Sequence, residues 1–297
     1  MQPELLLDAR LELGEGPAWD AQAGNLYFVD IHVGDLHLFH PADGMRRTVN
    51  LGEPLGCAVP SRSGYLLLAL RSGFATLDLD SPLLPEEEPG VIPLADPELH
   101  LPGNRFNDGK CDSRGRFLAG TMDDAEQEAS GSLYSYAPGG ALKTLLTGLR
   151  ISNGLTWSPD SQTFYFIDTP TRLVMAYDYD LDTGSIDRPR PVIHIPEKIG
   201  WPDGMTSDME GMLWVALWGG GMVTRWNPVT SQMLAAYPLP ARNVTSCIFG
   251  GADLTDLYIT SARKGMTAAQ LEEAPLSGGL FCIRTEVRGM PTFAFDG

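Results

Sequence analysis

A pattern that recurs six times constrains the fold of this 297-residue chain more than any other feature of its sequence. Each copy places a polar turn before a strongly apolar run, at residues 20–30, 60–70, 112–120, 158–168, 208–217 and 251–261. A third strand is expected after these runs, at 35–41, 73–80, 131–138, 173–180, 222–228 and 279–285. Equivalent positions recur every 42 to 50 residues. A period in the forties with about four strands per unit is typical of a β-propeller. We therefore predict an all-β, six-bladed β-propeller with a central channel.

The six units cover almost the whole chain, so residues 1–297 are predicted to form a single domain. A sandwich with irregular loops is the alternative, but it does not explain six similar hairpins. The first apolar segment, residues 4–13, is expected to pair with the last blade, which closes the ring and removes exposed edges. Residues 267–275 are the clearest helix candidate, and the four scattered cysteines are expected to be reduced thiols.

Charge and hydropathy exclude several classes of partner. The chain has 21 Lys and Arg against 38 Asp and Glu, a net charge of −17. Such an acidic chain is not expected to bind nucleic acid or an anionic membrane surface. No apolar run approaches the roughly 18 residues that a membrane span needs, and no signal peptide is apparent. We therefore expect a cytoplasmic protein, whose oligomeric state the sequence leaves unknown.

One slot at the start of each unit carries the functional prediction. It holds, in chain order, Glu15, Cys57, Asn107, Asn153, Asp203 and Ser246. The first strands of propeller blades line the central channel and enter it from the same face. The four side chains with carboxylate or amide groups should therefore converge near the axis, where they would repel one another or stay unsatisfied if left empty.

A divalent cation would resolve this convergence. Carboxylate and amide oxygens favour a hard ion such as Ca²⁺, Mg²⁺ or Mn²⁺, with Zn²⁺ also open. The alternative is that Asn and Asp before glycine merely form turns, because both residues tolerate left-handed backbone conformations.

The chain resembles the SMP-30/gluconolactonase/regucalcin family of six-bladed propellers. The resemblance rests on "LGEGPAWD", "RFNDGKCDSRGRFLAGTM", "ISNGLTWSPD", "WPDGMTSDMEGMLWVALWGGG" and "TAAQLEEAPLSGGLF", which span nearly the full chain in the family's order. It implies a lactonase with one divalent metal ion, whose identity stays open among Ca, Zn, Mg, Mn and Fe. It implies Glu15, Asn153 and Asp203 as metal ligands, with Asp203 also the catalytic acid/base. It further implies that Arg105 and Asn107 contact the sugar, so that Asn107 is a substrate contact at the edge of the metal's shell.

The chain departs from the family's pattern at one position. Some members carry a substrate-contacting glutamate three residues after the Met of "GTM", where this chain has Ala125. Asp123, Asp124 and Glu126 surround it, and any of them is a candidate replacement. Substrate preference therefore does not transfer from the family.

The expected activity is metal-dependent hydrolysis of a sugar-acid lactone, of the gluconolactone or pentonolactone type, to the aldonic acid. Whether Asp203 or the metal activates the attacking water is open, because coordination lowers the basicity of a carboxylate. The alternatives are a calcium-binding regulatory protein without turnover, and a promiscuous esterase or organophosphate hydrolase on the same scaffold. His32 is a candidate for a loop above the channel and Trp201 for the pocket rim, whereas Trp214 and Trp218 are expected to pack between blades.

Overall fold

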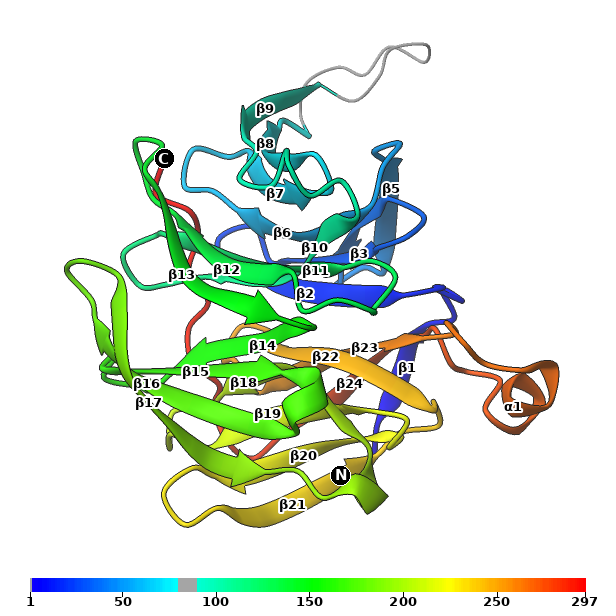
Figure 1. Ribbon diagram of the computed structural model, residues 1–297. Coiled ribbons are helices and arrows are strands. Elements are labelled where there is room, and N and C mark those ends of the chain that lie inside the picture. The colour runs from blue at the N-terminus through cyan, green and yellow to red at the C-terminus, as the bar shows by residue number, and fades with distance from the viewer. Residues whose placement is uncertain (1, 80–89) are drawn as a thin grey trace.

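Six four-stranded antiparallel sheets surround a common axis in the computed structural model, which describes residues 2–79 and 90–297 (Figure 1). This arrangement confirms the predicted six-bladed β-propeller. Five sheets follow chain order, β2 to β5, β6 to β9, β10 to β13, β14 to β17 and β18 to β21, and the sixth has the order β22-β23-β24-β1.

Each blade takes one strand at each of four distances from the axis. The innermost strands are β2 (Gly14–Asp20), β6 (Leu55–Pro60), β10 (Asn104–Cys111), β14 (Ser152–Trp157), β18 (Trp201–Ser207) and β22 (Asn243–Gly250). The second strands are β3 (Asn25–Asp30), β7 (Leu66–Leu70), β11 (Phe117–Asp123), β15 (Thr163–Asp168), β19 (Leu213–Trp218) and β23 (Asp256–Ala262). The third strands are β4 (Asp35–His40), β8 (Gly73–Leu77), β12 (Gly131–Tyr136), β16 (Leu173–Asp180), β20 (Met222–Asn227) and β24 (Leu280–Arg284). The outer strands are β5 (Met45–Asn50), β9 (Val91–Ala95), β13 (Leu142–Leu149), β17 (Ser185–His194), β21 (Gln232–Pro238) and β1 (Glu4–Leu7). Residue 80, the predicted end of one third strand, lies outside the described residues.

The ring is closed by the start of the chain. Strand β1 pairs antiparallel with β24, with Glu4 opposite Cys282 and Leu5 opposite Phe281. The prediction that the first segment joins the last blade is confirmed, although the strand ends at Leu7. Two short 3₁₀ helices, Thr169–Thr171 and Glu197–Ile199, lie between strands.

The predicted helix is also present. Helix α1 (Ala268–Glu273) projects from the body of the propeller in Figure 1. Thr267 caps it, with its side chain accepting from the backbone N–H of Gln270 while the Gln270 side chain accepts from the backbone N–H of Thr267. Such a reciprocal capping box compensates for the short length of a helix that buries none of its residues.

The hydrophobic core is divided among the contacts between neighbouring blades. Each of the six blade-to-blade contacts holds one buried cluster of apolar side chains among the described residues. In β7, Leu66, Leu68 and Leu70 pack toward the first blade, whereas Leu67 and Ala69 pack toward the third. Because both faces of such a strand are buried, the second strand of each unit is continuously apolar rather than alternating. All four cysteines are free thiols, as expected.

A shift of register interrupts every innermost strand at the slot residue. The shifts fall at residues 15–18, 55–57, 106–109, 152–155, 202–205 and 244–246. In β14, Asn153 and Gly154 together face a single residue of β15, and Asp203 and Gly204 do the same in β18. A β-bulge of this kind turns a side chain out of its regular direction. The bulges therefore help to aim the slot side chains.

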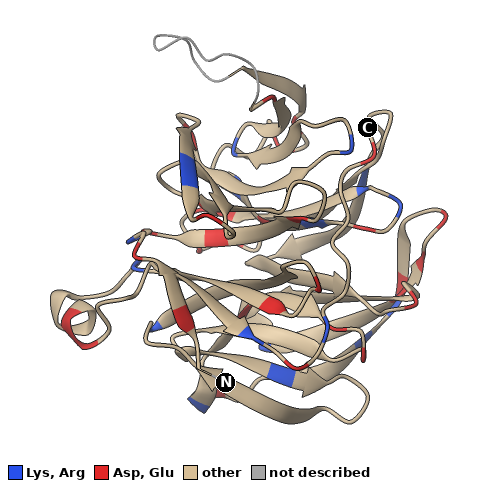
Figure 2. Cartoon of the chain, turned by 180° about the vertical axis from the view of Figure 1, so that it is seen from behind, with Lys and Arg blue, Asp and Glu red and all other residues tan. Residues whose placement is uncertain are grey.

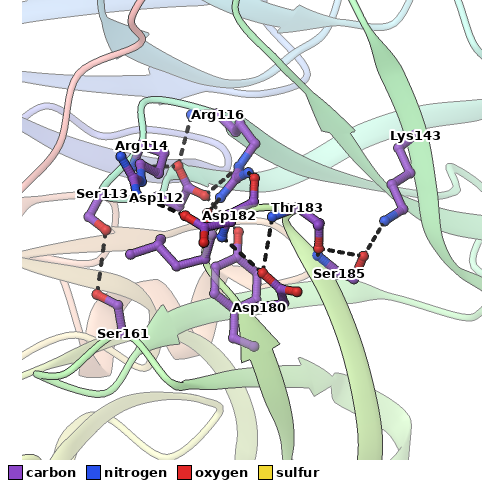
Figure 3. Close-up of polar contacts among 12 residues, drawn as sticks. Asp112, Ser113, Arg114, Arg116, Lys143, Ser161, Asp180, Asp182, Thr183 and Ser185 are labelled. Carbon is purple, nitrogen blue, oxygen red and sulfur yellow. Dashed lines mark hydrogen bonds and ion pairs between the residues drawn. The ribbon is translucent and has the colours of Figure 1, made fainter.

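A buried ion pair in the third blade, between Asp112 and Arg116, is hydrogen-bonded to the fourth blade (Figure 3). Asp112 accepts from Arg116 Nε at 2.7 Å and from the Tyr179 hydroxyl at 2.6 Å. Arg116 reaches across to the backbone carbonyls of Leu181 and Asp182 at 2.5 and 3.1 Å. The first turn of the third blade is thereby fixed to the outer hairpin of the fourth.

Charged residues are spread over the blades. Positions of Lys and Arg are interspersed with those of Asp and Glu in Figure 2. Among residues 2–79 and 90–297, no helix is long and apolar enough to cross a membrane.

Replacing Asp112 tests the contact between the third and fourth blades. Asp112→Ala leaves the largely buried Arg116 without its carboxylate, so we expect a loss of about 3–5 kcal/mol in the free energy of unfolding. Asp182→Ala is the matched control, because Asp182 is 84% exposed in its ion pair with Arg114 and should cost less than about 1 kcal/mol. Urea unfolding measures both, and equal losses would contradict the assignment.

His37 predicts a dependence of stability on pH. Burial and the neighbouring charge of Arg46 lower the pKa of His37 to about 4. Above about pH 6.5 both folded and unfolded states hold a neutral imidazole, whereas from there down to pH 4 only the unfolded state gains the proton. The free energy of unfolding should therefore decrease as the pH is lowered from about 6.5 to about 4. The urea midpoint of His37→Gln should fall less between pH 7 and pH 5 than that of wild type, by about 2 kcal/mol at most. The exposed control His100→Gln should follow wild type, and identical slopes for all three proteins would exclude the effect.

Candidate active site

A cavity of about 550 Å³ opens at the N-terminal ends of the innermost strands. All five residues predicted to act in the site line it: Glu15, Arg105, Asn107, Asn153 and Asp203. Their side chains come from four different blades and are at most 5% exposed. The structure therefore brings together residues that lie as much as 188 positions apart in the chain, as the propeller geometry predicted.

Two carboxyl groups meet on the floor of the cavity. Glu15 and Asp203 both line this cavity, are buried and influence each other's pKa values. Burial raises the pKa of Glu15 well above its ordinary value, and the charge of Asp203 raises it further. Burial likewise raises the pKa of Asp203, although a hydrogen bond from Asn153 opposes this. Two carboxylates out of water are unfavourable as an isolated pair, and a cation between them would offset that cost.

Hydrogen bonding distinguishes the two asparagines of the slot. The Asn153 amide nitrogen donates to Asp203 Oδ1 at 2.5 Å and to Thr169 Oγ1 at 3.1 Å. Its amide oxygen is buried and has no hydrogen-bond partner. By contrast, Asn107 Oδ1 accepts from Arg105 Nη1 at 2.7 Å, and its nitrogen donates to the Ser152 carbonyl at 2.9 Å. Asn153 thus has a free oxygen for a ligand, whereas that of Asn107 is already engaged.

The donor set fits a hard divalent ion. Glu15, Asp203 and the free amide oxygen of Asn153 offer oxygen ligands only, as Ca²⁺, Mg²⁺ and Mn²⁺ prefer. Among the described residues, no three His, Cys, Asp or Glu side chains gather in a way that would hold a metal.

The turn explanation for the Asn-Gly and Asp-Gly pairs does not hold. Gly154 and Gly204 lie inside innermost strands and not in turns, and neither has a positive φ. A Cβ on Gly154 would lie 2.6 Å from the Asp203 carbonyl oxygen, and one on Gly204 would lie 2.0 Å from Ser246 Oγ. Glycine is needed at both positions because neighbouring inner strands approach closely at the axis.

Arg105 is held rigidly at the cavity wall. Its Nε donates to Asp124 Oδ1 at 2.7 Å and its Nη1 donates to Asn107. Asp124 also pairs with Arg71, and His32 Nε2 lies 3.3 Å from Asp124 Oδ1. The side chain of Asp124 therefore orients Arg105, and His32 belongs to this surrounding network without lining the cavity.

The three acids around Ala125 have different partners. Asp123 accepts backbone N–H groups of its own loop from Gln127 and Glu128. Asp124 pairs with arginines, whereas Glu126 lines the cavity and pairs with Lys264 at 2.8 Å. Of the candidates for the missing glutamate, only Glu126 borders the cavity.

The tryptophans divide between cavity and core. Trp214 is fully buried against the sixth blade, as expected. Trp201 lines the cavity, and the Arg172 guanidinium carbon lies 3.5 Å from its ring centroid. Trp218 differs from the expectation, because it also lines the cavity while packing against the core of the first two blades. The end of β19 projects it beyond the contact between blades.

Sequence reasoning missed several residues of the site. Asp108, in the bulge after Asn107, has one buried carboxylate oxygen without a partner and raises the pKa of Glu15 and Asp203. Lys110 is buried nearby and donates to the Met205 carbonyl at 2.8 Å. The "NDGK" motif was a signal for both. Arg150 and Lys264 at the mouth lie in loops without a repeating pattern, so nothing in the sequence singled them out.

Comparisons with known proteins agree with this fold and site. The family model of the SMP-30/Gluconolactonase/LRE-like region matches residues 13–263. The chain belongs to this family. It is 37% identical over 297 residues to the Bacillus subtilis (strain 168) protein named "Putative sugar lactone lactonase YvrE", covering 100% of this chain and 99% of that protein. It is 36% identical to regucalcin of Oryctolagus cuniculus, covering 99% and 98%.

Solved structures show the same relationship. A calcium-binding protein, regucalcin, from Agrobacterium tumefaciens str. C58 superposes with a TM-score of 0.92 at 29% identity, covering 99% of this chain and 97% of that one. The similarity therefore extends over all six blades and is not confined to a single repeat.

The difference between the two asparagines can be tested by metal binding alone. After removal of metal by a chelator, titration with Mn²⁺ or Ca²⁺ in a calorimeter should show one site in wild type. Asn153→Ala removes the free amide oxygen and should weaken binding about tenfold or more. Asn107→Ala is the matched control and should change the affinity by less than about threefold, because its oxygen is engaged by Arg105. A larger effect at Asn107 than at Asn153 would reverse the assignment.

Proposed function

We propose that the protein hydrolyses a sugar-acid lactone to the open-chain aldonic acid, in a reaction that depends on one divalent metal ion. The metal ligands in this proposal are Glu15, Asn153 and Asp203. The observation that carries it is the pair of carboxyl groups beside a free amide oxygen, at the floor of an open cavity. Family membership and the lactonase name of a relative at 37% identity support the reaction class.

The chain's own residues divide the work of hydrolysis between them. When bound, the ion supplies a Lewis acid for the lactone carbonyl, which stabilises negative charge on its oxygen. Asp203 accepts a proton as water adds to the carbonyl carbon, and returns it to the ring oxygen as the ring C–O bond breaks. Arg105, fixed by Asp124 and Asn107, donates to a substrate hydroxyl group. One water is consumed, and the products are a carboxylic acid and a hydroxyl group on one open chain.

The cavity walls suit a small polyhydroxylated ring. Trp201 and Trp218 present apolar surface at the wall, whereas Arg105 and Asn107 present polar groups. The stacked Arg172 holds the Trp201 ring from one side. A lining that combines aromatic surface with hydrogen-bonding groups matches the apolar and polar faces of a sugar.

Acid release in a pH-indicator assay tests the reaction. Chelator-treated protein is re-supplied with single divalent metals and given a panel of aldonolactones, and spontaneous ring opening is subtracted. We expect turnover that depends on the metal, and Asp203→Ala should lower kcat/KM by about 100-fold or more. Asp182→Ala, which removes an exposed carboxylate outside the cavity lining, should retain wild-type activity.

Three other results would overturn the proposal. Metal binding without acid release from any sugar lactone would indicate a calcium-binding regulatory protein. Turnover of simple esters or organophosphates alone would indicate an esterase on the same scaffold. Full activity of the metal-free protein would remove the role of the ion.

A further inference from the structure

We infer that the lactone carries an anionic substituent, a carboxylate or a phosphate, at the end remote from its carbonyl, and that Arg150 is the residue that selects it. This inference rests on the proposed function, because the lactone carbonyl is taken to lie at the floor beside Glu15 and Asp203. The far end of the substrate then lies at the mouth, where the lining residues are more exposed.

The mouth is built from three loops that meet over the cavity. Glu126 comes from the connection between β11 and β12, Arg150 from that between β13 and β14, and Lys264 from the segment between β23 and α1. Lys264 Nζ donates to Glu126 Oε1 at 2.8 Å. Arg150 Nη2 lies 3.3 and 3.4 Å from the backbone carbonyls of Glu126 and Gln127. All three side chains line the same cavity.

Arg150 has no carboxylate partner among the residues that the structure describes. The other cationic residues of the lining do, since Arg105 pairs with Asp124 and Lys264 pairs with Glu126. The neighbouring acid Asp168 accepts from the backbone N–H groups of Arg150 and Ile151 and forms no ion pair with the Arg150 side chain. The Arg150 guanidinium therefore keeps donors available for a ligand, in the planar arrangement that suits a carboxylate or phosphate.

The charge of the lining points the same way. The cavity is lined by three cations and three carboxylates, and two of these carboxylates, Glu15 and Asp203, are the proposed metal ligands. The remaining acid of the lining is Glu126, which pairs with Lys264, whereas the three cations are Arg105, Arg150 and Lys264. Asp124 does not cancel this excess, because it is shared between Arg105 and Arg71. Apart from the proposed metal ligands, the lining thus holds three cations and one acid in a chain of net charge −17. Such a lining favours an anionic ligand over a neutral one.

The size of the cavity allows for the substituent. A volume of about 550 Å³ lies within the roughly 300–1,000 Å³ of pockets that hold drug-sized ligands. A single five- or six-membered ring at the floor leaves the mouth free, so a substituent on the ring has space to reach Arg150.

The experiment compares neutral and anionic forms of one ring in the metal-loaded protein. Glucono-δ-lactone is the neutral substrate, and the anionic ones carry a terminal carboxylate or a 6-phosphate. We expect kcat/KM to be about tenfold or more higher for at least one anionic lactone, and the two anionic arms identify which group is preferred. Arg150→Gln should lower the anionic value by about tenfold or more and the neutral value much less. Raising the salt concentration should reduce the preference.

Two further variants test the direction and the specificity of this effect. Among the mouth residues Glu126, Arg150 and Lys264, Glu126 is the one acid, so Glu126→Gln should increase the preference for the anionic lactone. Arg190→Gln, on the outer strand β17, is the matched control and should leave all values unchanged. A preference of less than threefold in wild type, unchanged in Arg150→Gln, would overturn the inference while leaving the lactonase intact.

Calorimetry separates this inference from the proposed function. Glucuronic acid and glucose 6-phosphate are titrated against glucose into the Mn²⁺-loaded wild-type and Arg150→Gln proteins. Tighter binding of an anionic sugar that depends on Arg150 supports the ligand class even if no lactone is hydrolysed, in which case only the reaction is wrong. Equal binding of neutral and anionic sugars, together with hydrolysis of neutral lactones, would show that the inference about the anionic substituent is wrong and that the proposed reaction is right.

Discussion

The floor of the cavity depends on holding two carboxyl groups, those of Glu15 and Asp203, side by side and out of water. Burial raises the pKa of both groups, and the charge of Asp203 raises that of Glu15 further, so the pair opposes folding unless a cation or a shared proton lies between them. The chain can hold them there because six apolar contacts between blades and the pairing of β1 with β24 fix the inner strands. The unfavourable burial of the two carboxyl groups is confined to the floor of the cavity, whereas the stabilising apolar contacts extend over all six blades.

The slot residues of four blades line the cavity, whereas those of the other two serve packing. Ser246 lies against Gly204, and Cys57 lies against Gly109, at positions where a larger residue on either strand would collide. These small slot residues let the inner strands approach, and the polar slots then converge on one small volume. The six slots are therefore not occupied by the same residue type. Six identical ligands around the axis would leave no space for a substrate and would not orient it.

Most charges at the wall and mouth of the cavity are opposite in sign to the net charge of the chain. Acidic residues give the chain its net charge of −17, whereas the wall and mouth of the cavity carry arginine and lysine. Asp124 shows how the two are linked, since it is anionic itself but serves to orient Arg105. The proposed hydrolysis uses the floor, and the proposed selection of an anionic substrate uses the mouth. Because different residues carry each, the two proposals stand or fall on separate measurements.

The sequence by itself determined the six blades, their closure and the convergence of the slot residues. The period of the repeat and the apolar runs can be read from the sequence, and in a propeller they fix where each blade and each slot residue lies. The family resemblance added Arg105 and changed the expected role of Asn107 from a metal ligand to a substrate contact. Only the tertiary structure decided that the oxygen of Asn153 is free while that of Asn107 is engaged, since this depends on Thr169 and Arg105, which are brought in by folding. It alone placed Arg150, Glu126 and Lys264 at one mouth. Loops between strands carry no period, so their meeting point follows from the ring that holds their ends.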